Sequence, residues 1–139
     1  MLSVYPAYFY EEYEGGYSVI FPDLNHLATQ GDTLNEALAM AIDCLAGYLY
    51  TLKQEKEIPP LPSDLKNLNA DDEYTEYKST FVNMVTVDVE EYAKLHFEKP
   101  VKKTLTIPKW LNDTAVASGI NFSSVLQKAL LQELKIGSC

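Results

Sequence analysis

The sequence predicts an α+β fold, in which a β-β-β-α-β sandwich is followed by a separate C-terminal unit. Two observations predict the sandwich: aromatic and β-branched stretches stand at both ends of the front part, and one long amphipathic stretch lies between them. The third observation is the charge. Residues 1–98 carry a formal charge of -13 and residues 99–139 carry +4, which together give the -9 of the chain. Such asymmetry indicates two units with different partners.

The first two strands are expected over residues 4–13 and 17–21, which are rich in aromatic and β-branched side chains. Gly15 and Gly16 lie between them, and this arrangement is typical of a β-hairpin. A short third strand is expected from Leu27 to Gln30.

The long helix is expected to begin at a capping box formed by Thr33 and Glu36. The hydroxyl should accept a hydrogen bond from an early backbone N–H, and the carboxylate should return to the cap residue. Apolar residues then recur at spacings of three and four as far as Leu52. This period predicts one amphipathic helix whose apolar stripe faces the sheet.

Residues 56–80 break this periodicity, and their prolines exclude a helix, so an irregular segment is expected there. Residues 81–89 resume β character and should return to the first sheet. Residues 90–100 are expected to be a weak helix or a tether. The front domain is therefore predicted to cover residues 1–98.

The C-terminal unit is expected to contain one strand over residues 101–107 and two helices. Pro108 fits the first turn of one helix, Gly119 should end that helix, and Asn121 should cap the next. One strand and two short helices cannot bury a core alone. The simplest partner is the same strand of a second chain, which predicts a homodimer.

Composition excludes several classes of protein. No apolar run is long enough to cross a bilayer, the N-terminus does not match a secretory signal, and a cytoplasmic protein without a membrane partner is expected. Cys44 and Cys139 do not suggest a disulfide. His26 and His96 are far apart and have no Cys or His at ligand spacing, so neither a metal site nor another cofactor is predicted.

Residues 101–136 resemble a ribbon-helix-helix DNA-binding domain, through the alternating strand, Pro108, Gly119 and Asn121. The resemblance implies that the outward strand residues Lys102, Thr104 and Thr106 enter the major groove. It also implies that backbone amides around Asn121, Phe122, Ser123 and Ser124 hold a phosphate, as free N–H groups at a helix start can. The chain has no arginine, so base reading would rest on lysine, threonine, asparagine or serine. The alternative is a strand with a merely solvated Lys/Thr face.

The stretch "FPDLNHLATQGDTLNEA", residues 21–37, resembles the HicB family of antitoxins. The matching positions are Phe21, Pro22, Asp23, Leu24, Gly31, Asp32, Thr33, Glu36 and Ala37. The resemblance implies a front domain with a partial RNase H fold that binds and silences HicA, a small basic toxin that cleaves mRNA. It also implies binding to operator DNA of the protein's own operon.

Two other functions remain open at this point. One is a transcription regulator whose front domain senses a small ligand. The other is a metal-dependent nuclease using Asp23, Asp32 and Asp43, but the expected helix cap and a wet helix face explain Asp32 and Asp43 better, so no catalytic residue is predicted. Contacts to a basic toxin are instead expected from four acidic residues: Glu11, Glu12, Glu14 and Asp23.

Overall fold

The computed structural model describes residues 1–136, so Cys139 lies outside the described residues. The chain divides into two units, of which the first covers residues 1–99 and the second begins at Pro100. Among residues 1–136, no helix combines the length and the apolar character needed to span a membrane.

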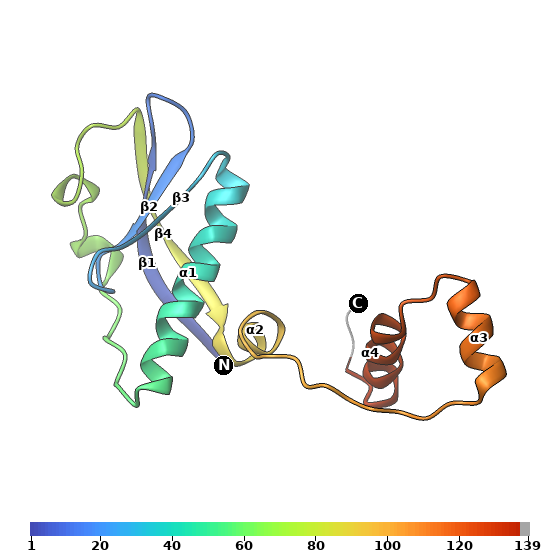
Figure 1. Cartoon of the computed structure of the whole chain (residues 1–139). Helices are drawn as coiled ribbons and strands as arrows, with labels where there is room; N and C mark the ends of the chain where they lie inside the picture. The colour runs from blue at the N-terminus through green and yellow to red at the C-terminus, as the bar shows by residue number, and fades with distance from the viewer. Residues whose placement is uncertain (137–139) are drawn as a thin grey trace. The chain divides into compact units, whose positions relative to one another are not determined.

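The first unit contains a fully antiparallel sheet of four strands in the order β3-β2-β1-β4 (Figure 1). Its strands are β1 (Leu2–Glu11), β2 (Tyr17–Phe21), β3 (Leu27–Gly31) and β4 (Ser79–Asp88). The expected return of the fourth strand to the sheet is confirmed, because β4 pairs with β1 along its whole length. β3 and β4 are therefore the two edges.

The β1–β2 hairpin is confirmed, and its turn shows why two glycines are needed. Gly15 and Gly16 have φ angles of 98° and 81°, a region that side chains with a Cβ rarely adopt. Glu12 donates its backbone N–H to the carbonyl of Gly16 at 3.0 Å, and Gly15 donates to the carbonyl of Glu12 at 3.1 Å. The first of these bonds sets the register in which Tyr10 faces Ser18.

Helix α1 (Leu34–Gln54) begins at the cap that the sequence predicts. The Glu36 amide donates to the Thr33 hydroxyl at 3.1 Å. The Glu36 carboxylate, however, accepts from the amide of Asp32 at 3.2 Å, one residue before the cap, so the prediction of its partner was wrong by one position. Both bonds satisfy N–H groups at the strand-to-helix turn, where the helix itself offers no acceptor.

Alternate residues of β1 point to opposite faces of the sheet and pack against two different layers of the unit. Tyr5, Ala7 and Phe9 pack against α1, in a core completed by residues of β2, β4 and the helix. Tyr8 and Tyr10 point to the opposite face and pack against Ala70. Burying one such large side chain contributes roughly 1.5–3 kcal/mol, so both layers stabilise the sheet.

The second layer is an irregular segment, residues 56–78, which we call the strap. Its only regular pieces are two 3-10 turns, Leu65–Asn67 and Ala70–Asp72. Figure 1 shows the part that carries the two 3-10 turns on the side of the sheet that α1 leaves open. Side chains from both faces of β1 hold the strap backbone: on the α1 face, the hydroxyl of Tyr5 donates to the carbonyl of Pro60, near the start of the strap. On the opposite face, the hydroxyl of Tyr10 donates to the carbonyl of Ala70 at 2.6 Å.

Residues 90–96, expected to be a weak helix or a tether, lie in helix α2 (Val89–His96). Asp88 caps this helix by accepting from the amide of Glu91 at 3.2 Å. Ala93 is buried, and Tyr92 and Phe97 pack against the main core. This part of the chain therefore belongs to the first unit.

The second unit contains helices α3 (Lys109–Ala117) and α4 (Phe122–Glu133). Gly119 ends the first helix at φ 70°, and the amides of Gly119 and Ile120 return to carbonyls of its last turn, at Val116 and Ala115. The expected strand over residues 101–107 is absent from the single chain. An isolated strand has no neighbour to bond with, so the single chain offers nothing to hold it.

Candidate functional site: an acidic depression on the sheet

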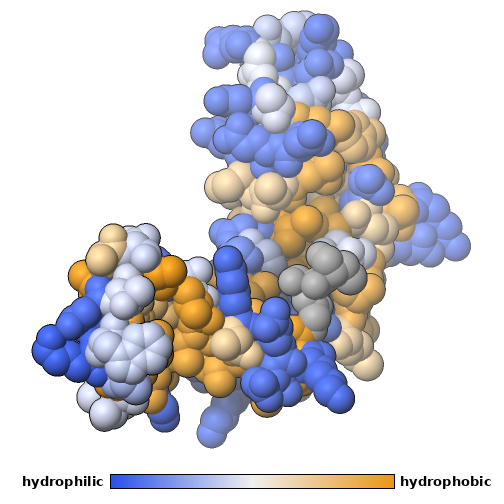
Figure 2. All heavy atoms as spheres, turned by 90° about the vertical axis from the view of Figure 1, so that its right-hand side faces the viewer, coloured by the Kyte–Doolittle hydropathy of each residue, from blue (hydrophilic) through white to orange (hydrophobic). Residues whose placement is uncertain are grey.

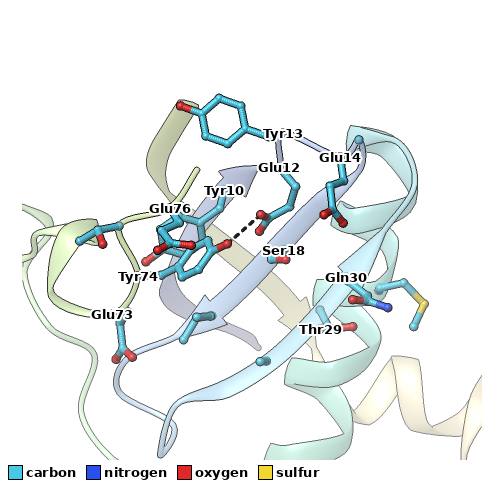
Figure 3. Close-up of a pocket in the computed structure, with 15 residues that line it drawn as sticks. Tyr10, Glu12, Tyr13, Glu14, Ser18, Thr29, Gln30, Glu73, Tyr74 and Glu76 are labelled. Carbon is cyan, nitrogen blue, oxygen red and sulfur yellow. Dashed lines mark hydrogen bonds between the residues drawn. The ribbon is translucent and has the colours of Figure 1, made fainter. Parts of the chain in front are cut away.

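An open depression of about 1170 Å³ lies on the β1–β2–β3 part of the sheet in the first unit. We call it the acidic depression. Figure 3 shows the β1–β2 turn, strands β2 and β3 and the end of the strap around it. It is lined by Tyr10, Glu12, Tyr13, Glu14, Gly15, Ser18, Ile20, Ala28, Thr29, Gln30, Met40, Glu73, Tyr74, Thr75 and Glu76.

Four of the lining residues are glutamates, and none is a lysine. Glu12 and Glu14 come from the hairpin, whereas Glu73 and Glu76 come from the strap. The Tyr74 hydroxyl donates to the Glu12 carboxylate at 3.1 Å and so joins the two segments (Figure 3). Clustered carboxylates of one sign create a negative potential that attracts a cationic partner.

Two tyrosines of the depression, Tyr10 and Tyr74, remain protonated donors at neutral pH. The hydrogen bond to Glu12 raises the pKa of Tyr74 above its ordinary value. Burial raises the pKa of Tyr10 further, and the nearby Glu73 adds to this effect. The rings of Tyr10 and Tyr74 meet edge to face, with centroids 5.3 Å apart, which fixes the wall of the depression.

Glu73 is held by a residue with an uncommon backbone. His26 has φ 59°, in the left-handed region, and its Nδ1 contacts the Glu73 carboxylate. The Glu73 side chain is only 17% exposed, whereas that of His26 is 67% exposed. The turn between β2 and β3 therefore positions one glutamate of the strap.

The shape and lining of the depression suit a protein surface better than a small molecule. Small-molecule sites are mostly apolar clefts that bury most of the ligand. This hollow is open, and four glutamates are among the residues that line it. No observation in the described part of the chain favours the ligand-sensing alternative.

Of the four acidic residues that the sequence predicts as toxin contacts, the structure places two in the depression and two outside it. Glu12 and Glu14 line the depression, but Glu11 does not, and its carboxylate accepts from the Ser79 hydroxyl at 2.9 Å. Asp23 also lies outside the depression and accepts from the backbone N–H of Ser63 at 2.7 Å, as well as from its hydroxyl. Asp23 is therefore an anchor of the strap.

Sequence reasoning missed the three strap residues Glu73, Tyr74 and Glu76. They lie in the segment expected to be irregular, where no periodicity assigns them to a face. The only available signal was the run "DDEYTEY", residues 71–77, which mixes acidic and aromatic residues as the hairpin turn does.

The three aspartates considered for nuclease chemistry do not form a metal site. Asp23 holds the strap, and Asp43 is exposed and accepts from the Tyr92 hydroxyl at 2.9 Å. Within residues 1–136, no three His, Cys, Asp or Glu side chains lie close enough to bind a metal ion together. Burial raises the pKa of the Cys44 thiol, which fits a packing role rather than a nucleophile.

The residues expected to bind DNA lie in the second unit. Lys102, Thr104 and Thr106 are exposed and precede α3. The Asn121 side chain accepts from the Ser124 amide at 3.0 Å, which confirms the predicted cap. Because this bond uses the Ser124 amide, the amides of Phe122 and Ser123 are the ones in this turn left for an anion.

The second unit exposes large apolar side chains that a stable domain would cover. No residue between 100 and 136 is buried. Figure 2 shows hydrophobic atoms on the surface of this unit, and Trp110 and Leu134 are 69% and 66% exposed. Apolar surface of this kind marks an interaction site.

Comparison with known proteins gives consistent results. A family model described as HicB-like antitoxin of bacterial toxin-antitoxin system matches residues 5–129. A solved structure described as a toxin-antitoxin complex from Streptococcus pneumoniae has 38% sequence identity and a TM-score of 0.62. The match covers 96% of this chain and 99% of that one.

Two curated relatives match over a shorter segment. Antitoxin HicB 1 of Photorhabdus laumondii is 45% identical over 58 residues, which cover 42% of this chain and 37% of the relative. Antitoxin HicB of Escherichia coli K12 is 38% identical over 63 residues, which cover 45% of this chain and 46% of the relative. The matched segment thus spans less than half the length of these relatives.

Proposed function

The chain belongs to the HicB-like family of bacterial antitoxins, and from this premise we propose that it neutralises a HicA-like toxin and represses its own operon by binding operator DNA. Proteins of this family are regulatory and non-enzymatic, and so is this chain. The toxin and the operator would both be cytoplasmic, so we place the protein in the cytoplasm.

The acidic depression carries the first half of the proposal. Glu12, Glu14, Glu73 and Glu76 face a partner that, in a HicA-like toxin, is basic because it binds RNA. The depression would cover this RNA-binding surface and so exclude the substrate. Charge supplies steering more than affinity, so Tyr13 and Tyr74 would add the contact area that aromatic side chains provide at interfaces.

A charge-removal experiment tests this assignment. We expect the triple variant Glu12→Gln, Glu14→Gln, Glu76→Gln to bind the product of the adjacent gene about 10-fold more slowly at low salt, because steering falls with local charge. The control removes three exposed glutamates outside the depression: Glu55→Gln, Glu57→Gln, Glu98→Gln. Surface plasmon resonance at several salt concentrations measures both. Equal slowing in the two variants would show that net charge, and not the depression, attracts the toxin.

The second unit supports the second half of the proposal. Its helices are unburied, and its residues 101–107 form neither helix nor strand in the single chain, so a second copy would supply the missing strand and cover the apolar side chains. A ribbon-helix-helix dimer of this kind would place Lys102, Thr104 and Thr106 of both chains on one two-stranded face. The start of α4 would then meet a phosphate through the amides of Phe122 and Ser123.

A further inference from the structure

The free edge of β3 borders the acidic depression. β3 is an outer strand, so one side of its backbone has no neighbouring strand. Thr29 and Gln30 are consecutive, so their side chains lie on opposite faces of the sheet, and yet both line the depression. Met40 of α1 lines it as well. The hollow therefore continues around the edge of the strand.

The hydrogen-bond register identifies which backbone groups are unpaired at this edge. Glu12 donates to the carbonyl of Gly16 and closes the hairpin. In an antiparallel ladder, bonded pairs alternate, so even-numbered residues of β2 bond with β1 and odd-numbered residues bond with β3. Val19 faces Thr29 in this register. The N–H and C=O groups of Ala28 and Gln30 consequently point away from the sheet.

This edge lacks three of the features that protect edge strands from pairing, namely a charged side chain, a proline and a bulge. Its sequence, "LATQG", has no proline and no charged side chain. Natural edges usually carry lysine, proline or a bulge to prevent another strand from adding. Figure 3 shows Thr29 and Gln30 on the side of the depression opposite Tyr74, with Glu14 above them.

We propose that the free edge of β3 accepts an extended, basic segment of the partner protein as a fifth strand of the sheet. This inference rests on the proposed function and describes the geometry of the proposed toxin binding. Main-chain hydrogen bonds to Ala28 and Gln30 hold the segment. Its alternate side chains reach the glutamates of the depression. A second copy of this chain is a poor occupant, because two front units of charge -13 repel each other.

The other edge strand of the sheet, β4, is the control for the proposed strand addition at β3. β4 is longer, and its stretch from Ser79 to Val87 is also uncharged. None of its residues lines the acidic depression, however. In the same register, Thr86 of β4 has its N–H directed away from β1, as Gln30 of β3 has its N–H directed away from β2.

Three single variants of the full chain test the edge. Gln30→Pro removes an outward N–H and places a ring where the added strand would lie, yet breaks no bond to β2. Gln30→Ala keeps the N–H and removes only the side chain. Thr86→Pro makes the same backbone change on the β4 edge. Calorimetric titration with the product of the adjacent gene gives the affinities.

We expect Gln30→Pro to bind at least about 10-fold more weakly than the unaltered chain and clearly more weakly than Gln30→Ala, whereas Thr86→Pro binds within about 3-fold of the unaltered chain. Equal weakening by Gln30→Ala would assign the effect to the side chain and overturn the inference. Weaker binding by Thr86→Pro alone would overturn the inference and indicate that the partner segment pairs with β4.

Hydrogen exchange on the unaltered complex gives a result that does not depend on the variants folding. The amides of Ala28 and Gln30 should become protected when the partner binds, and unchanged exchange there would overturn the inference. If the unaltered chain does not bind the adjacent gene product at all, the proposed function itself fails. Binding without protection leaves the proposed function standing and removes only the added strand.

Discussion

Replacing Asp23 should loosen the strap without removing a toxin contact. The Asp23 carboxylate accepts from the Ser63 amide at 2.7 Å and from the Ser63 hydroxyl, and both residues are half-buried. Asp23→Ala leaves the Ser63 amide without its partner. A hydrogen bond to a charged group contributes about 1.5–3 kcal/mol, so we expect the free energy of unfolding of the first unit to fall by about 2–3 kcal/mol.

Two further variants show how much of this loss in the free energy of unfolding comes from one hydrogen bond and how much from removal of a negative charge. Ser63→Ala keeps the bond from its amide and removes the one from its hydroxyl, so it should cost about 1 kcal/mol. Glu57→Ala removes an exposed negative charge and should change stability by less than about 0.5 kcal/mol.

Urea unfolding can follow the first unit by itself. All 10 tyrosines lie in residues 1–99, whereas the single tryptophan, Trp110, lies in the second unit. For Asp23→Ala, the tyrosine-detected midpoint should fall by about 1–2 M urea while the tryptophan-detected transition stays in place. An Asp23→Ala chain of undiminished stability that binds toxin poorly would refute this reasoning and return Asp23 to the toxin interface.

Two other predictions concern the second unit and α2. In a gel-shift titration, Thr104→Ala should reduce the free energy of binding to cognate operator DNA by about 1–3 kcal/mol and that to random DNA by far less. Ser123→Pro removes a backbone N–H at the start of α4, and it should weaken binding to both kinds of DNA alike. Unchanged operator affinity in a dimeric Thr104→Ala, Thr106→Ala chain would mean that this face does not read DNA. The hydrogen bond from the Glu91 amide holds the pKa of Asp88 below its ordinary value of 3.8. The stabilisation that ionised Asp88 provides is therefore complete at neutral pH and is lost as pH falls below about 4. Asp88→Asn should make the free energy of unfolding depend less on pH in this acid range. An unchanged pH dependence there would contradict the prediction.

Local signals predicted the elements that local residues determine. Gly15 and Gly16 located the hairpin because the turn needs positive φ, and Thr33 located the start of α1 because its hydroxyl reaches Glu36. The same signals could not give the path of the strap. That path depends on hydrogen bonds between residues far apart in sequence, such as Tyr10 to Ala70, and no pattern in residues 56–78 encodes them.

The strand expected over residues 101–107 shows a different limit. Its alternation of apolar and polar residues is real in the sequence, but a strand exists only when a neighbour completes its hydrogen bonds. The helices α3 and α4 form in the single chain because their backbone bonds are internal. The strand over residues 101–107 therefore stays a prediction, because its neighbour would have to come from a second chain.

Tyr10 connects the core of the first unit to its candidate site. The residue is fully buried, its hydroxyl donates to the carbonyl of Ala70, and its ring packs on Tyr74. Tyr74 in turn donates to Glu12 at the rim. The glutamates of the hairpin and of the strap thus keep their positions only while the strap stays seated on β1. We therefore expect the stability of this layer and the proposed affinity for a basic partner to be coupled, since the contacts that order the strap also assemble the depression.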